Sequence, residues 1–294
     1  MKSFFALTQC AAFAASALCV IAANAAVVTT PSGTVVGVAG GVSDTPAADT
    51  WLRDNVRAGS TTGITTHFPE SGDGSAYMSS SDGLGKADWD YYKTGGFGKL
   101  SAIPTYSYEW YRAASSSVAP HLHPVMRLIV DIDGDLGTTD IGYLVFERAY
   151  NPSTSPVPVG AWTAETITGT TNLWLSQPGQ GIEEVYNRTL ADYQSGTYTP
   201  TAGWKKITGN SVVIGISLGI GSGWAGTFEG AVDNPTLGAF SSNFEVTAPA
   251  VAATPVAVPA LDLVGLLALS GALGVTASAL ARRRRKTDAS RSGA

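Results

Sequence analysis

The sequence has few of the residues on which covalent chemistry usually depends. Its 294 residues include two cysteines and three histidines, and only 14% of them are charged. The one G-x-S-x-G stretch, Gly215 to Gly219, lies inside an apolar strand-like run and not at a strand-to-helix turn, and no glycine-rich loop leads into a helix as a phosphate site requires. These features argue against serine-hydrolase and nucleotide chemistry, and we predict no catalytic residue.

The first 25 residues have the three-part layout of a secretory signal peptide. Lys2 precedes an apolar stretch, which ends in small residues with an A-x-A pattern at Ala23 to Ala25. This layout predicts export and cleavage after Ala25 or Ala26. Both cysteines, Cys10 and Cys19, would be removed, so disulfides and thiol catalysis are excluded. A retained N-terminal membrane helix is the alternative.

A second apolar run lies near the C-terminus. No residue from Leu263 to Ala281 is charged, which is close to the length that spans a bilayer. We therefore predict a transmembrane helix over residues 261–281 and an Arg-rich tail over 282–294. The tail begins with four arginines, which the positive-inside rule places in the cytoplasm, so the rest of the chain lies outside the inner membrane. They are Arg282, Arg283, Arg284 and Arg285.

The order of these parts resembles the C-terminal sorting signals of bacterial surface proteins, the PEP-CTERM and IPTL-CTERM classes. The sorting signal would cover residues 258–294 and begin with the motif Val258, Pro259, Ala260 and Leu261. Ala260 and Leu261 stand where one class has Glu-Pro, and Ala260 stands where the other has Thr. The resemblance implies an exosortase-type transpeptidase as partner and processing at the C-terminus. A plain C-terminal anchor is the alternative.

Between these ends the apolar pattern has a period of two. Tyr106, Tyr108 and Trp110 alternate with polar residues, and further strand-like runs are separated by Gly, Pro, Asn and Asp clusters. We predict an all-β sandwich of jelly-roll type over residues 26–246. One short helix is expected within 181–196, and the Pro- and Ala-rich stretch 247–257 is expected to be a linker.

The stretch from Gly223 to Gly238, "GWAGTFEGAVDNPTLG", is similar to the last strands of concanavalin-A-like and carbohydrate-binding jelly rolls. The similarity lies in Asp233 and Asn234, followed by Leu237 and Gly238. The earlier run "GSAYMSSSDGLGKADWDYY" resembles an early strand of such modules. The resemblance implies a jelly-roll fold and does not identify a ligand, because jelly rolls host many unrelated functions.

The stretch "DIDGDLG" is a candidate calcium site. Asp131, Asp133 and Asp135 alternate at the end of an apolar strand, and a turn at Gly134 could bring their carboxylates around one cation. The alternative is a solvated hairpin tip in which Asp and Gly serve the turn. His121 and His123 could suit zinc, but no third ligand follows at a recognisable spacing.

Tryptophan and charge point to the ligand class. Tryptophan offers the flat faces on which sugar rings stack, and Trp204 and Trp224, which stand in Gly-containing loops, are expected to be exposed and to bind ligand. Residues 26–257 contain 11 Lys and Arg against 21 Asp and Glu, a net charge of −10, which repels nucleic acid.

We therefore predict an exported cell-surface or extracellular-matrix protein that binds carbohydrate, with polysaccharide as partner and calcium as a cofactor. A self-associating structural envelope protein is the alternative. A polysaccharide hydrolase is a third reading, which needs two carboxylates across a cleft. Its candidate carboxylates are Glu109, Glu147, Glu183, Glu184 and Glu229.

Overall fold

The structure is a computed structural model that describes residues 25–29, 35–38, 41–138, 140–152 and 156–247. The predicted signal peptide up to residue 24, the linker beyond residue 247 and the whole predicted sorting signal lie outside the described residues. Among the described residues, no helix has the length and apolar character needed to cross a membrane. The predicted domain bounds and the transmembrane helix stay predictions.

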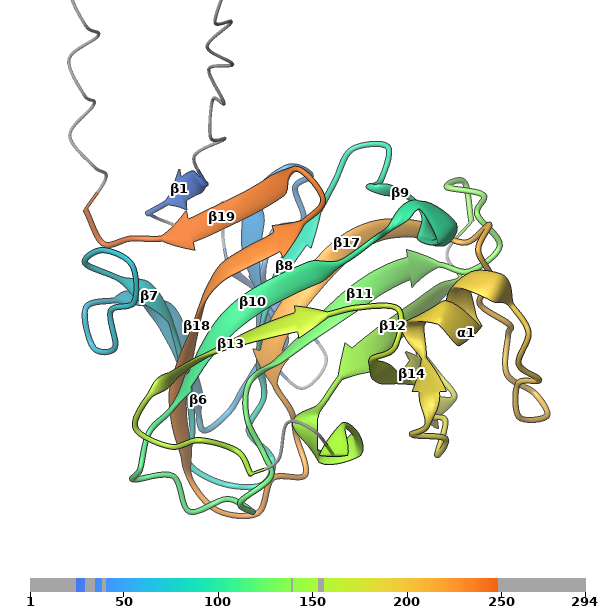
Figure 1. The fold of residues 1–294 in the computed structure, drawn as a ribbon. Coiled ribbons are helices and arrows are strands. Elements are labelled where there is room, and N and C mark those ends of the chain that lie inside the picture. The colour runs from blue at the N-terminus through green and yellow to red at the C-terminus, as the bar shows by residue number, and fades with distance from the viewer. Residues whose placement is uncertain (1–24, 30–34, 39–40, 139, 153–155, 248–294) are drawn as a thin grey trace, which may run out of the picture. The chain divides into compact units, whose positions relative to one another are not determined.

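Two large β-sheets and one small sheet make up the described chain (Figure 1). Every strand pair is antiparallel except β1 with β19, which is parallel. The seven-stranded sheet contains β1 (Ala26–Val28), β6 (Ser60–Thr65), β7 (Ser75–Ser80), β10 (Tyr106–Arg112), β13 (Trp162–Ile167), β18 (Phe228–Leu237) and β19 (Phe240–Phe244). Its central strand β18 pairs with β10 on one side and with both β7 and β19 on the other.

The nine-stranded sheet contains β4 (Trp51–Asp54), β8 (Ala87–Tyr92), β9 (Gly98–Lys99), β11 (Val125–Asp131), β12 (Ile141–Phe146), β14 (Asn172–Gln177), β15 (Gly181–Ile182), β16 (Arg188–Thr189) and β17 (Val212–Ile220). Its main path runs β15-β14-β12-β11-β17-β8-β4. The small sheet is formed by β2 (Val35–Val38), β3 (Gly41–Asp44) and β5 (Val56–Arg57).

The alternation of β10 explains how the core forms. Tyr106, Tyr108 and Trp110 are buried, whereas the residues between them are half-buried on the other face, as the sequence predicts. Inward residues of both large sheets belong to one hydrophobic cluster, which includes Leu128 of β11 and Leu144 of β12. The two sheets therefore pack face to face, and the all-β sandwich is confirmed.

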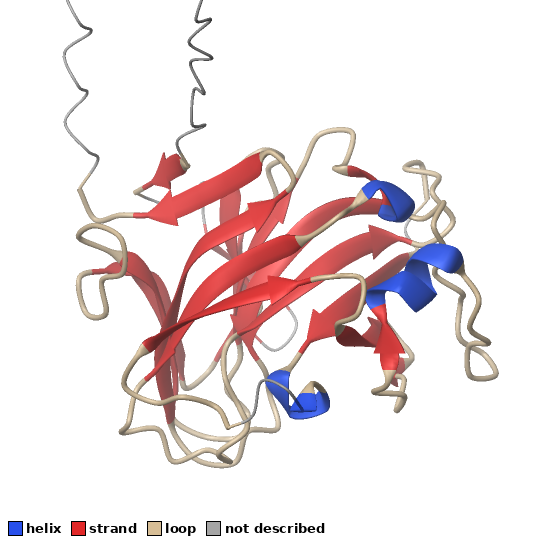
Figure 2. Cartoon of the chain, viewed as in Figure 1, coloured by secondary structure: helices blue, strands red, loops and turns tan. Residues whose placement is uncertain are grey.

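Helix is sparse in the described chain (Figure 2). The one α-helix is α1 (Leu190–Ser195), and two short 3-10 helices are η1 (Leu100–Ala102) and η2 (Arg148–Tyr150). A capping box between Thr189 and Asp192 begins α1, and Gly196, with φ of +64°, ends it. The short helix is confirmed, but helical character before residue 190 is wrong, because β15 and β16 extend the sheet there.

Asp233 joins the end of the sandwich to its central strand. Its carboxylate is fully buried, and Oδ1 accepts hydrogen bonds from the backbone N–H groups of Asn234 (2.8 Å) and Phe244 (2.9 Å). Burial raises the pKa of this carboxyl to about 7, although the two N–H donors act in the opposite direction. Asp233 therefore holds β18 to β19 and has a carboxyl that is costly to ionise.

Replacing Asp233 tests this role. At pH 8 we expect Asp233→Ala to lower the free energy of unfolding by about 2–3 kcal/mol, because two buried N–H groups lose their acceptor. Asp233→Asn keeps an acceptor oxygen and removes a charge that burial disfavours, so it is expected to be at least as stable as the unsubstituted protein. Denaturant unfolding measures both, and an alanine variant of undiminished stability would contradict the assigned role.

Candidate functional site

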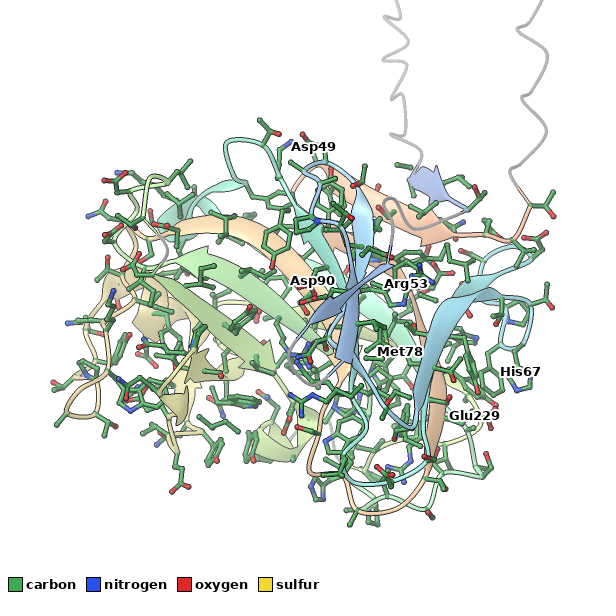
Figure 3. All side chains as sticks on the ribbon, turned by 180° about the vertical axis from the view of Figure 1, so that it is seen from behind. Asp49, Arg53, His67, Met78, Asp90 and Glu229 are labelled. Carbon is green, nitrogen blue, oxygen red and sulfur yellow. The ribbon has the colours of Figure 1, made fainter. Side chains whose placement is uncertain are left out.

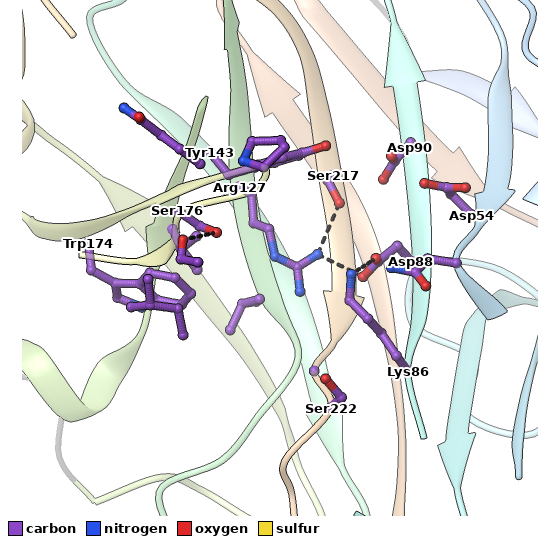
Figure 4. Close-up of a pocket in the computed structure, with 18 of the residues that line it drawn as sticks. Asp54, Lys86, Asp88, Asp90, Arg127, Tyr143, Trp174, Ser176, Ser217 and Ser222 are labelled. Atoms are coloured by element: carbon purple, nitrogen blue, oxygen red, sulfur yellow. Dashed lines mark hydrogen bonds and ion pairs between the residues drawn. The ribbon is translucent and has the colours of Figure 1, made fainter. Parts of the chain in front are cut away.

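A cavity of about 620 Å³ lies on the outer face of the nine-stranded sheet (Figure 4). It follows from strand alternation: Asp88 and Asp90 point outward on either side of the core residue Trp89, and Arg127 does so between two core residues of β11. The charged, polar and aromatic lining comprises Asp54, Asn55, Arg57, Lys86, Asp88, Asp90, Arg127, Tyr143, Glu147, Trp174, Ser176, Gln177, Ser217, Ser222 and Trp224.

The centre of the cavity is held by an ion-pair network (Figure 4). Asp88 Oδ1 lies 2.8 Å from Nη1 of Arg127, and its other oxygen pairs with Lys86. Arg127 Nη1 also donates to Ser217 Oγ at 3.0 Å, so the guanidinium is fixed across three neighbouring strands, β8, β17 and β11. Lys86 and Arg127 together neutralise Asp88.

A glycine makes room for this network. A Cβ atom at Gly219 would collide with the Asp88 carboxylate and lie 2.9 Å from Arg127 Nη1. Gly219 stands between Val125 and Asp88 in the pairing of the three strands. The missing side chain therefore lets the carboxylate and the guanidinium meet above β17.

Asp90 differs from Asp88 because no cation neutralises it. Its side chain is 3% exposed; Oδ2 accepts from the Tyr92 hydroxyl at 3.3 Å, and Oδ1 has no hydrogen-bond partner. Burial, followed by the charges of Asp88 and Asp54, raises the pKa of Asp90 to about 7. Asp90 therefore lines the cavity, and its Oδ1 is a buried acceptor without a hydrogen-bond donor.

The other end of the cavity is aromatic. Trp174 and Tyr143 are half-buried there, and the indole Nε1 of Trp174 makes no hydrogen bond. Burial raises the pKa of the neighbouring Glu147 to about 7, opposed by Arg127 and by the nearby Trp174 indole, which does not reach hydrogen-bond geometry with the carboxylate. The aromatic rings of Trp174 and Tyr143 therefore lie in the same part of the cavity as the Glu147 carboxyl and the unpaired indole N–H of Trp174.

A second cavity of about 330 Å³ adjoins the first. It is lined by Leu52, Tyr92 and residues of β3, and it shares Asp54 and Asp90 with the larger cavity. Five strand spacings separate β14 from β4, and at about 4.8 Å each they span about 24 Å. The two cavities therefore extend across the sheet, with Asp54 and Asp90 at their boundary.

The two tryptophans that the sequence analysis predicts as ligand-binding lie in different environments. Trp224 lines the large cavity but is only 8% exposed, because its ring packs edge-on against Phe228 with 5.2 Å between centroids. Its predicted exposure is wrong. Trp204 is half-buried against the core and does not line the large cavity. Trp174 is the half-buried tryptophan in the cavity.

The predicted calcium residues are only partly brought together. Carboxylate oxygens of Asp131, Asp133 and Asp140 lie within 4.8 Å of one another, whereas Asp135 is not in this group. Asp135 instead accepts the N–H of Gly137 at 3.0 Å within the turn. Thr138 Oγ1 donates to Asp140 at 2.9 Å. The three grouped carboxylates suit a hard cation, and calcium binding itself stays a prediction.

The two histidines of "HLH" do not form a metal pair. His123 is 1% exposed and stacks on Trp110 at 4.6 Å between ring centroids, whereas His121 is exposed. His123 Nδ1 lies 2.7 Å from the carbonyl of Pro124, and Nε2 accepts from the N–H of Arg148 at 3.1 Å. Burial lowers the pKa of His123 to about 3, so both ring nitrogens serve the fold.

Five cavity residues are not among the site residues predicted from the sequence: Asp54, Asp88, Asp90, Arg127 and Trp174. A signal exists in two strands: Asp88 and Asp90 alternate with a core tryptophan, and Arg127 interrupts an apolar run. A charge in the middle of a buried strand requires a partner on a neighbouring strand. The register that supplies this partner is not readable from the sequence.

Replacing Asp90 by Asn tests whether the ionised form of this buried carboxyl destabilises the fold. The unfolded chain loses this proton near pH 4 and the folded protein only near pH 7, so the free energy of unfolding falls across this interval. We expect the difference in free energy of unfolding between the Asn variant and the unsubstituted protein to increase by about 3 kcal/mol, in favour of the variant, as the pH rises from 5 to 8. Denaturant unfolding at both pH values measures this, with exposed Asp135→Asn as control. A gain that is independent of pH would contradict it.

Calcium titration tests the metal prediction at residue level. If calcium binds the three grouped carboxylates, the melting temperature rises with added calcium because the ion binds only the folded state. We expect Asp140→Asn to abolish this rise and Asp135→Asn to preserve it. The reverse pattern would support the set of residues chosen from the sequence, and no rise in the unsubstituted protein would remove the site.

Comparisons with known proteins show what the chain is similar to. No protein-family model and no curated protein sequence matches it. A family 11 carbohydrate-binding module of a Clostridium thermocellum cellulosomal cellulase matches with 12% identity over 66% of this chain and 89% of that chain, at a TM-score of 0.35. An endo-β-1,4-glucuronan lyase from Trichoderma reesei matches with 13% identity over 63% and 90%, at 0.36. A cellulose-induced protein matches with 14% identity over 67% and 94%, at 0.32.

Proposed function

We propose that the β-sandwich binds carbohydrate in the cavity on the outer face of the nine-stranded sheet. The observation that carries this proposal is the half-buried Trp174 beside unpaired polar atoms in one cavity. A volume of about 620 Å³ is that of an ordinary small-ligand site. The cavity is therefore large enough for part of an oligosaccharide.

Sugar chemistry fits the two halves of the cavity. A pyranose ring has an apolar face that packs on an aromatic ring, and Trp174 and Tyr143 offer such rings. Its hydroxyls both donate and accept; Asp90 Oδ1 and Trp174 Nε1 are buried in the free protein, and a rotation of each side chain lets one hydroxyl donate to the first and another accept from the second. A ligand of this kind pairs two polar atoms that the protein leaves unpaired.

Export and surface display complete the proposal. They rest on the signal-peptide pattern at the N-terminus and on the sorting-signal pattern over residues 258–294. In this proposal an exosortase-type transpeptidase processes the C-terminus, and the sandwich meets polysaccharide at the cell surface or in the extracellular matrix. The acidic sandwich would repel nucleic acid there.

A glycan array followed by calorimetric titration tests carbohydrate binding. We expect Trp174→Ala to weaken binding about tenfold or more, because an aromatic anchor of a binding site commonly contributes this much. Trp204→Ala is the matched control: it removes a half-buried tryptophan that does not line the large cavity, and it should leave affinity unchanged.

Other outcomes separate the alternatives. Binding lost in Trp204→Ala but kept in Trp174→Ala would move the site to the loop that the sequence predicts. No binding to any glycan, with a molecular mass that grows with concentration, would favour the self-associating envelope protein. New reducing ends in the glycan would favour a hydrolase, for which Glu147 is the one candidate glutamate from the sequence that lines the cavity.

A further inference from the structure

Asp54 and Asp90 are acidic side chains without a cation. They lie side by side at the boundary of the two cavities (Figure 4), and no Lys, Arg or His in the described part of the chain forms an ion pair with either. Asp54 accepts a hydrogen bond from the Ser43 hydroxyl, and Asp90 accepts one from the Tyr92 hydroxyl. Both donors are neutral, so neither carboxylate is in contact with a cation.

Four other well-buried carboxylates have a cation in contact, and Asp131, Asp233 and Glu245 accept hydrogen bonds from backbone N–H groups instead. Arg53 pairs with Asp44, Arg148 with Glu165, and Arg188 with Glu183, whereas Asp88 has both Lys86 and Arg127. A buried charge without a partner is costly. Arg53, labelled near Asp90 in Figure 3, is already engaged by Asp44 through two nitrogens, at 2.8 and 3.1 Å. Asp90 has neither a cation in contact nor a backbone N–H donor, and the half-buried Asp54 beside it has no cation either, so the pair points to a positive group that the ligand brings.

The geometry favours an ammonium group over a metal ion. Among the described residues, the carboxylates that converge closely enough to hold a metal are Asp131, Asp133 and Asp140, and the pair at the cavity boundary is not among them. A metal ion needs several ligand oxygens around one point, whereas an ammonium group needs acceptors in only a few directions. Asp90 Oδ1, which has no partner, provides one such acceptor inside the cavity.

We propose that the two adjoining cavities bind an amino-sugar polymer with free amino groups, and that one ammonium group lies between Asp54 and Asp90. This inference rests on the proposed carbohydrate-binding function and names its substrate class. The sugar rings pack along Trp174 and Tyr143, and the charged substituent reaches the acidic boundary. An N-acetylated sugar lacks the charge and gains nothing there.

The electrostatic surroundings of Asp90 predict a proton signature. Asp54 of β4, Asp88 and Tyr92 of its own strand, Arg127 of β11, Tyr143 of β12 and Ser217 of β17 surround it. Burial and then the charges of Asp88 and Asp54 favour the protonated form of Asp90, while the nearby Ser217 hydroxyl and Arg127 oppose them. A bound ammonium favours the ionised form, so binding of a ligand whose amino groups are already protonated, at a pH below the raised pKa of Asp90, releases a proton from Asp90.

Three tetrasaccharides that differ only at C2 of each ring test the proposal. The purified full-length chain is titrated by calorimetry with tetramers of β-1,4-linked glucosamine, N-acetylglucosamine and glucose at about pH 5.5, where the amino groups are already protonated and which is below the raised pKa of Asp90. We expect the glucosamine tetramer to bind about tenfold to a hundredfold more tightly than the other two. Repeating the titration in buffers of different ionisation enthalpy should show proton release for this ligand alone.

Two variants place the effect on the carboxylates. Asp90→Asn should remove both the preference for glucosamine and the proton release, and Asp54→Asn, at a more exposed position, should reduce the preference. Circular dichroism checks that each variant is folded. A preference that survives both substitutions would place the ammonium elsewhere and overturn the inference.

The failures of the two proposals are distinguishable. Equal affinity for the three tetramers, lost in Trp174→Ala, would overturn the amino-sugar inference and leave carbohydrate binding standing. Binding of none of the tetramers, together with no binding on the glycan array, would overturn both.

Discussion

The ion pair between Asp88 and Arg127 is the contact on which the cavity depends. It joins two strands that are separated by β17, and it exists because Gly219 of that intervening strand has no side chain. Both partners are buried, so their attraction has to offset a large loss of hydration. Lys86 and Ser217 add the contacts that satisfy the remaining atoms. At this ion pair the outer face of the sheet is therefore polar but buried.

The ion pair also affects the ionisation of two other carboxyls in the cavity, those of Asp90 and Glu147. Because Arg127 and Lys86 are engaged by Asp88, neither forms an ion pair with Asp90 or Glu147. Both of these carboxyls have a pKa raised to about 7 by burial, and they line the same cavity. The net charge of the cavity consequently changes near neutral pH, where a small change in surroundings can alter the ligand that it accepts.

Much of the fold could be predicted from the sequence, because alternation within one strand is local. Tyr106, Tyr108 and Trp110 indicate their common face without knowledge of any other strand. The candidate site could not be predicted in this way, since it joins residues of β4, β8, β11, β14 and β17 through register. The hairpin that follows β11 shows the same limit. Proximity in sequence selects Asp135, but the chain folds back and brings Asp140 to the other two carboxylates.

Trp224 shows why residue type and loop position mislead. A tryptophan among glycines suggests an exposed platform, yet the glycines allow the chain to fold the ring back onto Phe228. Trp174 lies within a strand and shows no such signal, but it faces outward because Leu173 and Leu175 face the core. Which tryptophan can meet a ligand is therefore decided by the strand face.

Asp90 and Asp233 show that a raised pKa does not by itself mark a functional group. Burial raises both pKa values to about 7, and each carboxylate has one oxygen without a partner. The difference lies in the other oxygen. In Asp233 it accepts two backbone N–H groups and so holds two strands together, whereas in Asp90 it accepts only a long hydrogen bond from a tyrosine. Asp90 also lines both cavities, whereas Asp233 lines neither. The cost of burying Asp233 is offset by the fold, and the cost of burying Asp90 is left for a ligand to offset.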